Sequence, residues 1–224
     1  MIARDDLLRI AIWSRDLNER ELDVARGGIV ERSYAANESI FVRGDHFDYW
    51  TGVVSGLVRV GMVSRGGKAT SFTGLRSGAW FGEGTVLKKE PRRYDIVALR
   101  DSRLALMDSS TFFWLYENSA AFNRFLVTQL NERLGQFIAF VEYGRTLDAT
   151  ARLARSIASL FNPILYPELN RHLEITQEEI GALSGISRQN ANQCLKRLEK
   201  EGLLRLEYGG VTIVDLDGLR SYGD

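Results

Sequence analysis

Residues 175–199 carry the pattern that most narrows what this chain can fold into. Thr176 and Glu179 have the spacing of a capping box, and Ser187 is a second helix N-cap. Gly185 lies between them, where glycine can end the first helix because it adopts a left-handed backbone at little cost. The segment therefore predicts two short helices joined by a tight turn.

The second of these helices is expected to have one apolar and one polar face. Across both helices and the turn, the residues expected to face the core are Ile180, Leu183, Ile186, Ala191, Leu195 and Leu198. The outward-facing residues are Arg188, Gln189, Asn190, Asn192, Gln193 and Lys196. Such side chains suit the major groove of duplex DNA, because Arg can bond guanine and Asn or Gln can bond adenine through two hydrogen bonds. We expect Arg188, Gln189 and Gln193 to read bases, with Ser187 and Thr176 completing the DNA-binding set.

Positive charge is concentrated beside this motif although the chain as a whole is neutral. The sequence has 29 Lys and Arg against 29 Asp and Glu, and residues 150–224 hold 9 against 10. Residues 186–205 hold five basic residues and two Glu, so phosphate contacts would come from a local patch. Residues 203–207 and 211–215 flank a Tyr-Gly-Gly turn and predict a hairpin, the wing of a winged helix-turn-helix, in contact with phosphates.

Residues 29–108 have a different texture, with short runs of β-branched and aromatic residues separated by glycines. This rhythm predicts an antiparallel β-roll. Two hairpins are expected, one pairing 49–54 with 57–63 across Ser55-Gly56, and one pairing 57–63 with 69–75 across residues 65–68. Short helices between residues 5 and 27 would cap the roll.

A long proline-free helix is predicted from about residue 118 to 145, roughly 40 Å in length. Apolar residues recur along it at alternating spacings of three and four: Val127, Leu130, Leu134, Phe137 and Val141. This is a heptad seam, which favours a homodimer, although a helix packed on its own domain would show a similar stripe. A helix over about 149–161 and a loop with Pro163 and Pro167 follow.

The predicted fold class is α+β, with an N-terminal antiparallel β-roll (double-stranded β-helix) flanked by helices. The expected domains are a sensor roll at 1–117, a dimerisation helix at 118–146 and a winged helix-turn-helix at 147–224. The sequence has no long apolar run or secretory signal, so a cytoplasmic protein without membrane contact is expected. One cysteine, Cys194, and two distant histidines, His46 and His172, lead us to expect no metal, haem or iron–sulfur cluster.

The order of roll, heptad helix and winged module resembles the bacterial CRP/FNR superfamily of transcription regulators over almost the whole chain. Phe81-Gly82-Glu83 followed by Arg92-Arg93 looks like that family's phosphate-binding cassette. The resemblance implies a cyclic-nucleotide-binding-like sensor in which Glu83 bonds a ribose hydroxyl and Arg93 pairs with the cyclic phosphate. The ligand-binding residues it suggests are Gly82, Glu83, Gly84, Arg92, Arg93, Tyr94 and Phe137. It also implies RNA polymerase as a partner.

The identity of the effector is left open by the sequence. Tyr94 stands where nucleotide binders usually have a small residue. Phe137 and Ile138 stand where cyclic-AMP-responsive members place hydroxyl groups, and an unpaired polar edge on the base would cost about 1–3 kcal/mol per group. A cyclic nucleotide is therefore possible, but cyclic AMP is disfavoured. Glu83 and Arg93 could equally be a structural pair in a roll that binds nothing.

Two alternatives to a ligand-controlled regulator follow. One is a DNA-binding regulator that works without any ligand. The other is a cupin-like metal-dependent enzyme, whose site would need two or three histidines and a carboxylate on neighbouring strands. With only His46 and His172, far apart in the sequence, the enzyme is the weaker of the two, and we expect no catalytic residues.

Overall fold

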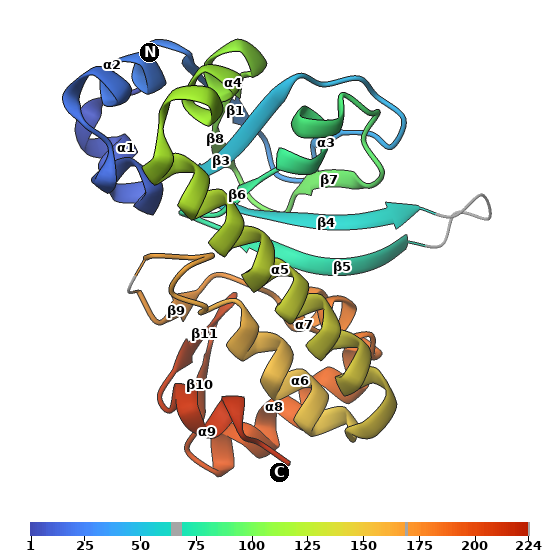
Figure 1. The fold of residues 1–224 in the computed structure, drawn as a ribbon. Helices are drawn as coiled ribbons and strands as arrows, with labels where there is room; N and C mark the ends of the chain where they lie inside the picture. Colours follow the sequence, from blue (N-terminus) through green and yellow to red (C-terminus); the bar gives the residue numbers. More distant parts are fainter. Residues whose placement is uncertain (64–68, 169, 224) are drawn as a thin grey trace. The chain divides into compact units, whose positions relative to one another are not determined.

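The computed structural model describes residues 1–63, 69–168 and 170–223, and Figure 1 traces them from the N-terminus to the C-terminus. The chain divides into two compact units. The roll unit contains Met1–Glu132 and Pro163–Glu168, and the winged unit contains Arg133–Asn162 and the chain beyond Glu168. The predicted boundaries at residues 117/118 and 146/147 stay a prediction. The two units are defined by their internal contacts, whereas the predicted domains were defined by the function expected of each.

Helices precede the first strand of the roll unit, separate two of its strands and follow its last strand. They are α1 (Arg4–Ile10), the 3-10 helix η1 (Ile12–Asp16), α2 (Glu19–Gly27), α3 (Glu83–Lys88) and α4 (Ser109–Asn118). Asn18 and Glu21 form a capping box at the start of α2. Asp108 caps α4 by accepting a hydrogen bond from the Thr111 N–H. Side-chain oxygens thus satisfy free backbone donors at both starts.

Two four-stranded antiparallel sheets make the roll, which confirms the predicted fold class. The first has the order β1 (Ile29–Tyr34), β8 (Ser102–Asp108), β3 (Tyr49–Ser55) and β6 (Trp80–Phe81). The second has the order β2 (Ser39–Phe41), β7 (Asp95–Ala98), β4 (Leu57–Val63) and β5 (Ala69–Arg76).

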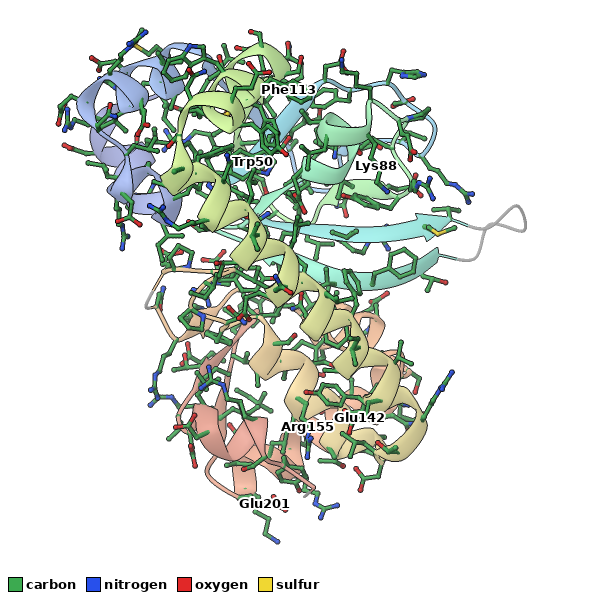
Figure 2. All side chains as sticks on the ribbon, in the orientation of Figure 1. Trp50, Lys88, Phe113, Glu142, Arg155 and Glu201 are labelled. Atoms are coloured by element: carbon green, nitrogen blue, oxygen red, sulfur yellow. The ribbon has the colours of Figure 1, made fainter. Side chains whose placement is uncertain are left out.

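The central strands β8 and β3 of the first sheet are buried on both faces. Along β8, Leu104 and Leu106 belong to one apolar cluster, and Ala105 and Met107 belong to another. The cluster with Leu104 and Leu106 contains residues of both sheets, so it is the interior of the roll. The other cluster joins the sheet to the helices and includes Trp50, which Figure 2 labels among the crowded side chains of this unit. Because successive side chains of a strand point to opposite faces, β8 contributes residues to both apolar clusters.

The hairpin predicted across Ser55-Gly56 is wrong. Strand β3 pairs with β6 and β8, whereas β4 pairs with β5 and β7 in the other sheet. Gly56 has a φ of +95°, and a Cβ at this position would lie 2.8 Å from the Asp101 carbonyl oxygen. The turn therefore carries the chain from one sheet to the other, because both edges of β3 are already occupied by β6 and β8.

The second predicted hairpin is confirmed, since β4 and β5 pair antiparallel from Leu57↔Arg76 to Val63↔Ala69. Its predicted turn at residues 65–68 lies outside the described residues. The long helix is also confirmed: α5 (Ala120–Thr146) has 27 residues and is drawn as one continuous helix in Figure 1.

The winged unit is built from helices and one small sheet. Its elements after α5 are α6 (Ala149–Ser159), β9 (His172–Leu173), α7 (Gln177–Ser184), α8 (Arg188–Lys200), β10 (Leu204–Glu207), β11 (Gly210–Ile213) and α9 (Leu216–Arg220). The sheet has the antiparallel order β10, β11, β9. Among the described residues, no helix is long and apolar enough to cross a membrane.

Candidate nucleic-acid interface and ligand pocket

The two predicted helices and their turn are present as expected. The Glu179 N–H donates to the Thr176 hydroxyl at 3.2 Å, and the Thr176 N–H donates to the Glu179 carboxylate at 2.7 Å. Gly185 ends α7 with φ +67° and ψ 31°, in the left-handed region. The Ser187 hydroxyl accepts from the Asn190 N–H at 3.3 Å and starts α8. The capping box, the glycine turn and the second cap are confirmed.

A second glycine, which the sequence analysis did not single out, brings the two helices close together. A Cβ on Gly181 would lie 3.0 Å from the Ile186 carbonyl oxygen and 3.3 Å from the Ala191 Cβ. A larger side chain would force the start of α8 away from α7. Glycine at this position therefore helps fix the angle between α7 and α8. The sequence signal for this contact was the small residue four positions before Gly185.

The outer face of α8 is polar and solvent-exposed. Ala191, Cys194, Leu195 and Leu198 are buried. The exposed residues are Arg188, Gln189, Asn190, Gln193 and Lys196. Asn192 differs from the expectation: it is half-buried, and its side-chain oxygen is inaccessible and has no hydrogen-bond partner among the described residues. Asn192 follows the buried Ala191 and lies at the edge of the helix face that packs into the core.

Fewer of the basic residues near α8 are without an acidic partner than the sequence count indicated. Arg197 donates to Glu201 at 3.0 Å, and Arg205 lies 3.5 Å from Glu207. Within the described chain, Arg188, Lys196 and Lys200 form no salt bridge. Exposed ion pairs are weak, so Arg197 and Arg205 can still exchange their partners for a phosphate. Arg188, Lys196 and Lys200 can bind DNA without breaking an ion pair.

The wing is attached to the end of α8 by a charged hydrogen bond. The Leu206 N–H donates to the Glu199 carboxylate at 2.7 Å. Strands β10 and β11 pair from Leu204↔Ile213 to Glu207↔Gly210, which confirms the predicted hairpin. The Tyr208 side chain at its tip is fully exposed. Strand β9 adds a third strand that the sequence analysis missed.

The predicted heptad residues share one exposed face of α5. Val127, Leu130, Leu134, Phe137 and Val141 are 42% to 60% exposed, and Ile138 beside them is 60% exposed. The same helix buries Phe122, Leu126, Gln129 and Gln136 on another face. The intrachain core therefore uses a different face, and the heptad face is an apolar stripe left open.

Arg92 is the buried arginine of the predicted cassette. Its side chain is 1% exposed, and its Nη2 donates to the Tyr49 carbonyl oxygen at 3.0 Å. The guanidinium carbon lies 4.8 Å from the centroid of the Phe41 ring and 5.5 Å from that of Phe47. Gly82 has a φ of +93°, and a Cβ there would overlap the Arg92 Nη1, so glycine leaves room for the guanidinium.

Buried polar atoms at this site lack partners. The Nε and Nη1 of Arg92 have no hydrogen-bond acceptor among the described residues, and the same holds for the buried Oε2 of the half-buried Glu83. Burial lowers the pKa of Arg92, while the hydroxyl of Tyr94 and the charge of Glu83 act to raise it. The site therefore offers two donors and one acceptor that a ligand could satisfy.

Arg93 is placed differently from the expectation that it would pair with a phosphate beside Glu83. Its side chain is 76% exposed and donates to Glu90 at 2.7 Å on the surface. Tyr94 is half-buried and packs against the interior cluster of the roll, and Gly84 is exposed. The structure thus brings Gly82, Glu83, Arg92 and Tyr94 together and leaves Arg93 outside.

Phe137 and His172 belong to the winged unit, whereas the pocket and His46 belong to the roll unit. Phe137 belongs to the part of α5 in the winged unit, so its predicted ligand contact stays a prediction. His46 is exposed in the roll unit, and His172 lies on β9 of the winged unit. Among the described residues, no group of three or more His, Cys, Asp or Glu side chains is arranged to hold a metal ion.

Comparison with known proteins matches family models to two regions of the chain. A family model described as a cyclic nucleotide-binding domain matches residues 31–119, and one described as a Crp-like helix-turn-helix domain matches residues 151–222. The chain is 27% identical to the Cyclic AMP receptor protein of Thermus thermophilus, over 88% of this chain and 89% of that protein. It is 26% identical to the cAMP-activated global transcriptional regulator Vfr of Pseudomonas aeruginosa, over 87% and 93% of the two chains.

A solved structure of the c-di-GMP responsive global regulator CLP of Xanthomonas campestris shares the fold. Its TM-score is 0.63 at 22% identity, with 88% of this chain and 99% of that one covered. Roll, long helix and winged helix-turn-helix together define a DNA-binding transcription regulator. The chain belongs to the CRP/FNR family of bacterial transcription regulators.

The turn between α7 and α8 gives a stability prediction. Gly185→Ala meets no atom within 4 Å, so its cost is the left-handed backbone alone, about 1–2 kcal/mol of unfolding free energy. Gly135→Ala on α5 is the matched control: it also meets no atom within 4 Å, and alanine in a helix stabilises by about 0.5–1 kcal/mol. Urea denaturation followed by circular dichroism measures both. Equal stability of the two variants would contradict the turn geometry.

Proposed function

We propose that this chain is a homodimeric transcription regulator of the cytoplasm whose α8 reads operator bases and whose roll responds to a small anionic ligand. The observation that carries the proposal is the exposed, acid-free outer face of α8, held by two capped helix starts, the close approach at Gly181 and the left-handed turn at Gly185. A recognition helix needs this rigidity, because bidentate base contacts tolerate little misplacement. We propose RNA polymerase as a further partner on the family resemblance alone.

Base reading is assigned to Arg188, Gln189 and Gln193, with phosphate contacts from Lys196, the exposed tip of the wing and the two helix starts. Arg188 is the first residue of α8, and Gln189 follows it in the same turn. Recognition helices contact base edges mainly through their N-terminal residues, which favours these two positions. Gln193 lies about one turn further along the same exposed face.

Arg188→Ala should lower discrimination between the operator and a site with one changed base pair by about 1–3 kcal/mol, since a bidentate contact is lost. Fluorescence anisotropy with both duplexes measures the difference. Arg32→Ala, on the exposed surface of β1, removes the same charge elsewhere and should leave discrimination unchanged. If Arg188→Ala keeps the full preference of the natural chain, Arg188 is not a base reader.

The apolar stripe on α5 supports a dimer formed by two copies of this helix. Leu134→Lys places a charge in the middle of the stripe, and burying it unpaired would split the dimer. Thr128→Lys adds the same charge at an exposed position of α5 that is not part of the stripe. Analytical ultracentrifugation should show monomers for Leu134→Lys and dimers for Thr128→Lys. Monomers in the unaltered chain would refute the proposal.

The ligand class follows from the unpaired atoms of the roll. The two free donors of Arg92 call for oxyanion oxygens, and the free Oε2 of Glu83 calls for a hydroxyl donor. A cyclic nucleotide carries both groups. The named relatives include proteins that respond to cyclic AMP and to cyclic di-GMP, so both belong among the ligands to test.

Isothermal titration calorimetry with cyclic AMP, cyclic GMP and cyclic di-GMP tests this pocket. For a nucleotide that binds, Arg92→Gln should weaken affinity by about tenfold or more, because a charged hydrogen bond contributes about 1.5–3 kcal/mol. Arg93→Gln should bind as the unaltered chain does, since Arg93 is held at the surface by Glu90. The reverse order would restore Arg93 as the phosphate partner. No heat with any of the three would favour a regulator that works without these ligands.

A further inference from the structure

A short segment between two elements of the winged unit is packed in the roll unit. Helix α6 ends at Ser159 and β9 begins at His172, and both belong to the winged unit. Between them the chain enters the roll unit at Pro163–Glu168, a segment we name the strap. The strap therefore joins the two units a second time, independently of α5.

The strap is anchored by buried side chains. Leu165 and Tyr166 are each 2% exposed and belong to the apolar cluster inside the roll. The Tyr166 hydroxyl donates to the Gly74 carbonyl oxygen at 3.0 Å. A surface loop that only connected two elements would not bury a tyrosine and satisfy its hydroxyl.

Two further contacts hold the end of the strap. Gly78 has a φ of +85°, and a Cβ there would lie 2.7 Å from the Pro167 Cδ, so the roll has a space that fits the proline ring. The Glu168 carboxylate lies 3.9 Å from the Nη2 of Arg76, whose side chain is 5% exposed. Burial lowers the pKa of Arg76, and the charge of Glu168 acts to raise it. Glu168 thus offsets part of the cost of burying this guanidinium.

The strap shares its cluster with the walls of the ligand pocket. Phe41 and Phe81 belong to the same cluster as Leu165 and Tyr166, and their rings lie 6.3 Å apart. Phe41 stacks against the Arg92 guanidinium, and Phe81 directly precedes Gly82. A shift of Arg92 would therefore repack residues that hold the strap, because close-packed interiors transmit displacement.

The elements at both ends of the strap contact the DNA-reading parts of the winged unit. On α6, the Thr150 hydroxyl lies 3.5 Å from the sulfur of Cys194 on α8. On the other side, β9 pairs with β11 of the wing through Leu173↔Val211 and His172↔Thr212. A displacement of the strap can therefore be transmitted to α8 through α6 and to the wing through β9.

We propose that the strap is a positioning element that couples the state of the ligand pocket to the placement of α8 and the wing. The proposal rests on the proposed regulator function. It requires two states, strap docked and strap released, that differ in affinity for DNA. By linkage, DNA binding must then alter strap docking by the same factor as docking alters DNA binding.

The first test uses the full-length unaltered chain, so no substitution can confound it. Hydrogen exchange is followed with and without saturating operator DNA obtained by selection from random duplexes. The amides of Leu165, Tyr166 and Glu168 should change their exchange rates by about tenfold or more. The amides of Ala36 and Asn37, which are hydrogen-bonded within the roll, serve as controls and should not change. Unchanged strap amides in a chain that binds DNA would overturn the proposal.

The second test loosens the strap without removing its apolar packing. Tyr166→Phe with Glu168→Gln deletes only the hydroxyl and the charge, and the dissociation constant for operator DNA should change by about fivefold or more. Tyr116→Phe with Glu117→Gln makes the same chemical changes at exposed positions of α4 and should leave it unchanged. Equal affinity of both double variants would count against the strap. Failure of the unaltered chain to bind any duplex would instead reject the regulator function itself.

Discussion

Burial of strands β8 and β3 on both faces is the constraint on which the roll unit depends. Residues of β8 alternate between two cores, so neither core can be repacked without moving the strand that serves the other. One core anchors the helices through Trp50, which packs against Trp13, Trp80 and Phe122. The other holds the second sheet, the pocket walls and the strap. A change at the pocket therefore acts on a rigid layer.

The start of each helix in the winged unit is stabilised by residues close to it in the sequence. Each helix start is satisfied by a side chain three residues away, and the turn between α7 and α8 needs only Gly185 and a small neighbour at Gly181. These local contacts orient α8, and its buried residues Ala191, Leu195 and Leu198 anchor it in the core of the unit. Control of DNA binding then requires only that the unit be moved, not that it be refolded. Strap and α5 are the two parts of the chain through which such movement would pass.

Interactions between residues close in the sequence could be predicted, whereas those between distant residues could not. The caps at Thr176 and Ser187 were predictable, because the partner lies within three residues. The hairpin across Ser55-Gly56 was predicted wrongly, because a turn signal does not say which sheet the next strand joins. Arg92 and Arg93 are chemically equivalent in sequence, and only the packing against Phe41 and Gly82 distinguishes them. The strap reads as a proline-bearing loop, since its docking depends on residues far away in the chain.

Selection of duplexes from a random pool by the full-length protein, followed by sequencing, tests the central claim most directly. A dimer that presents two copies of α8 should enrich an inverted repeat whose half-sites are centred about one helical turn apart, roughly 10–10.5 base pairs. Each half-site should contain positions at which one base is strongly preferred, as bidentate contacts require. Enrichment of a single unrepeated site, or of no sequence at all, would contradict the account.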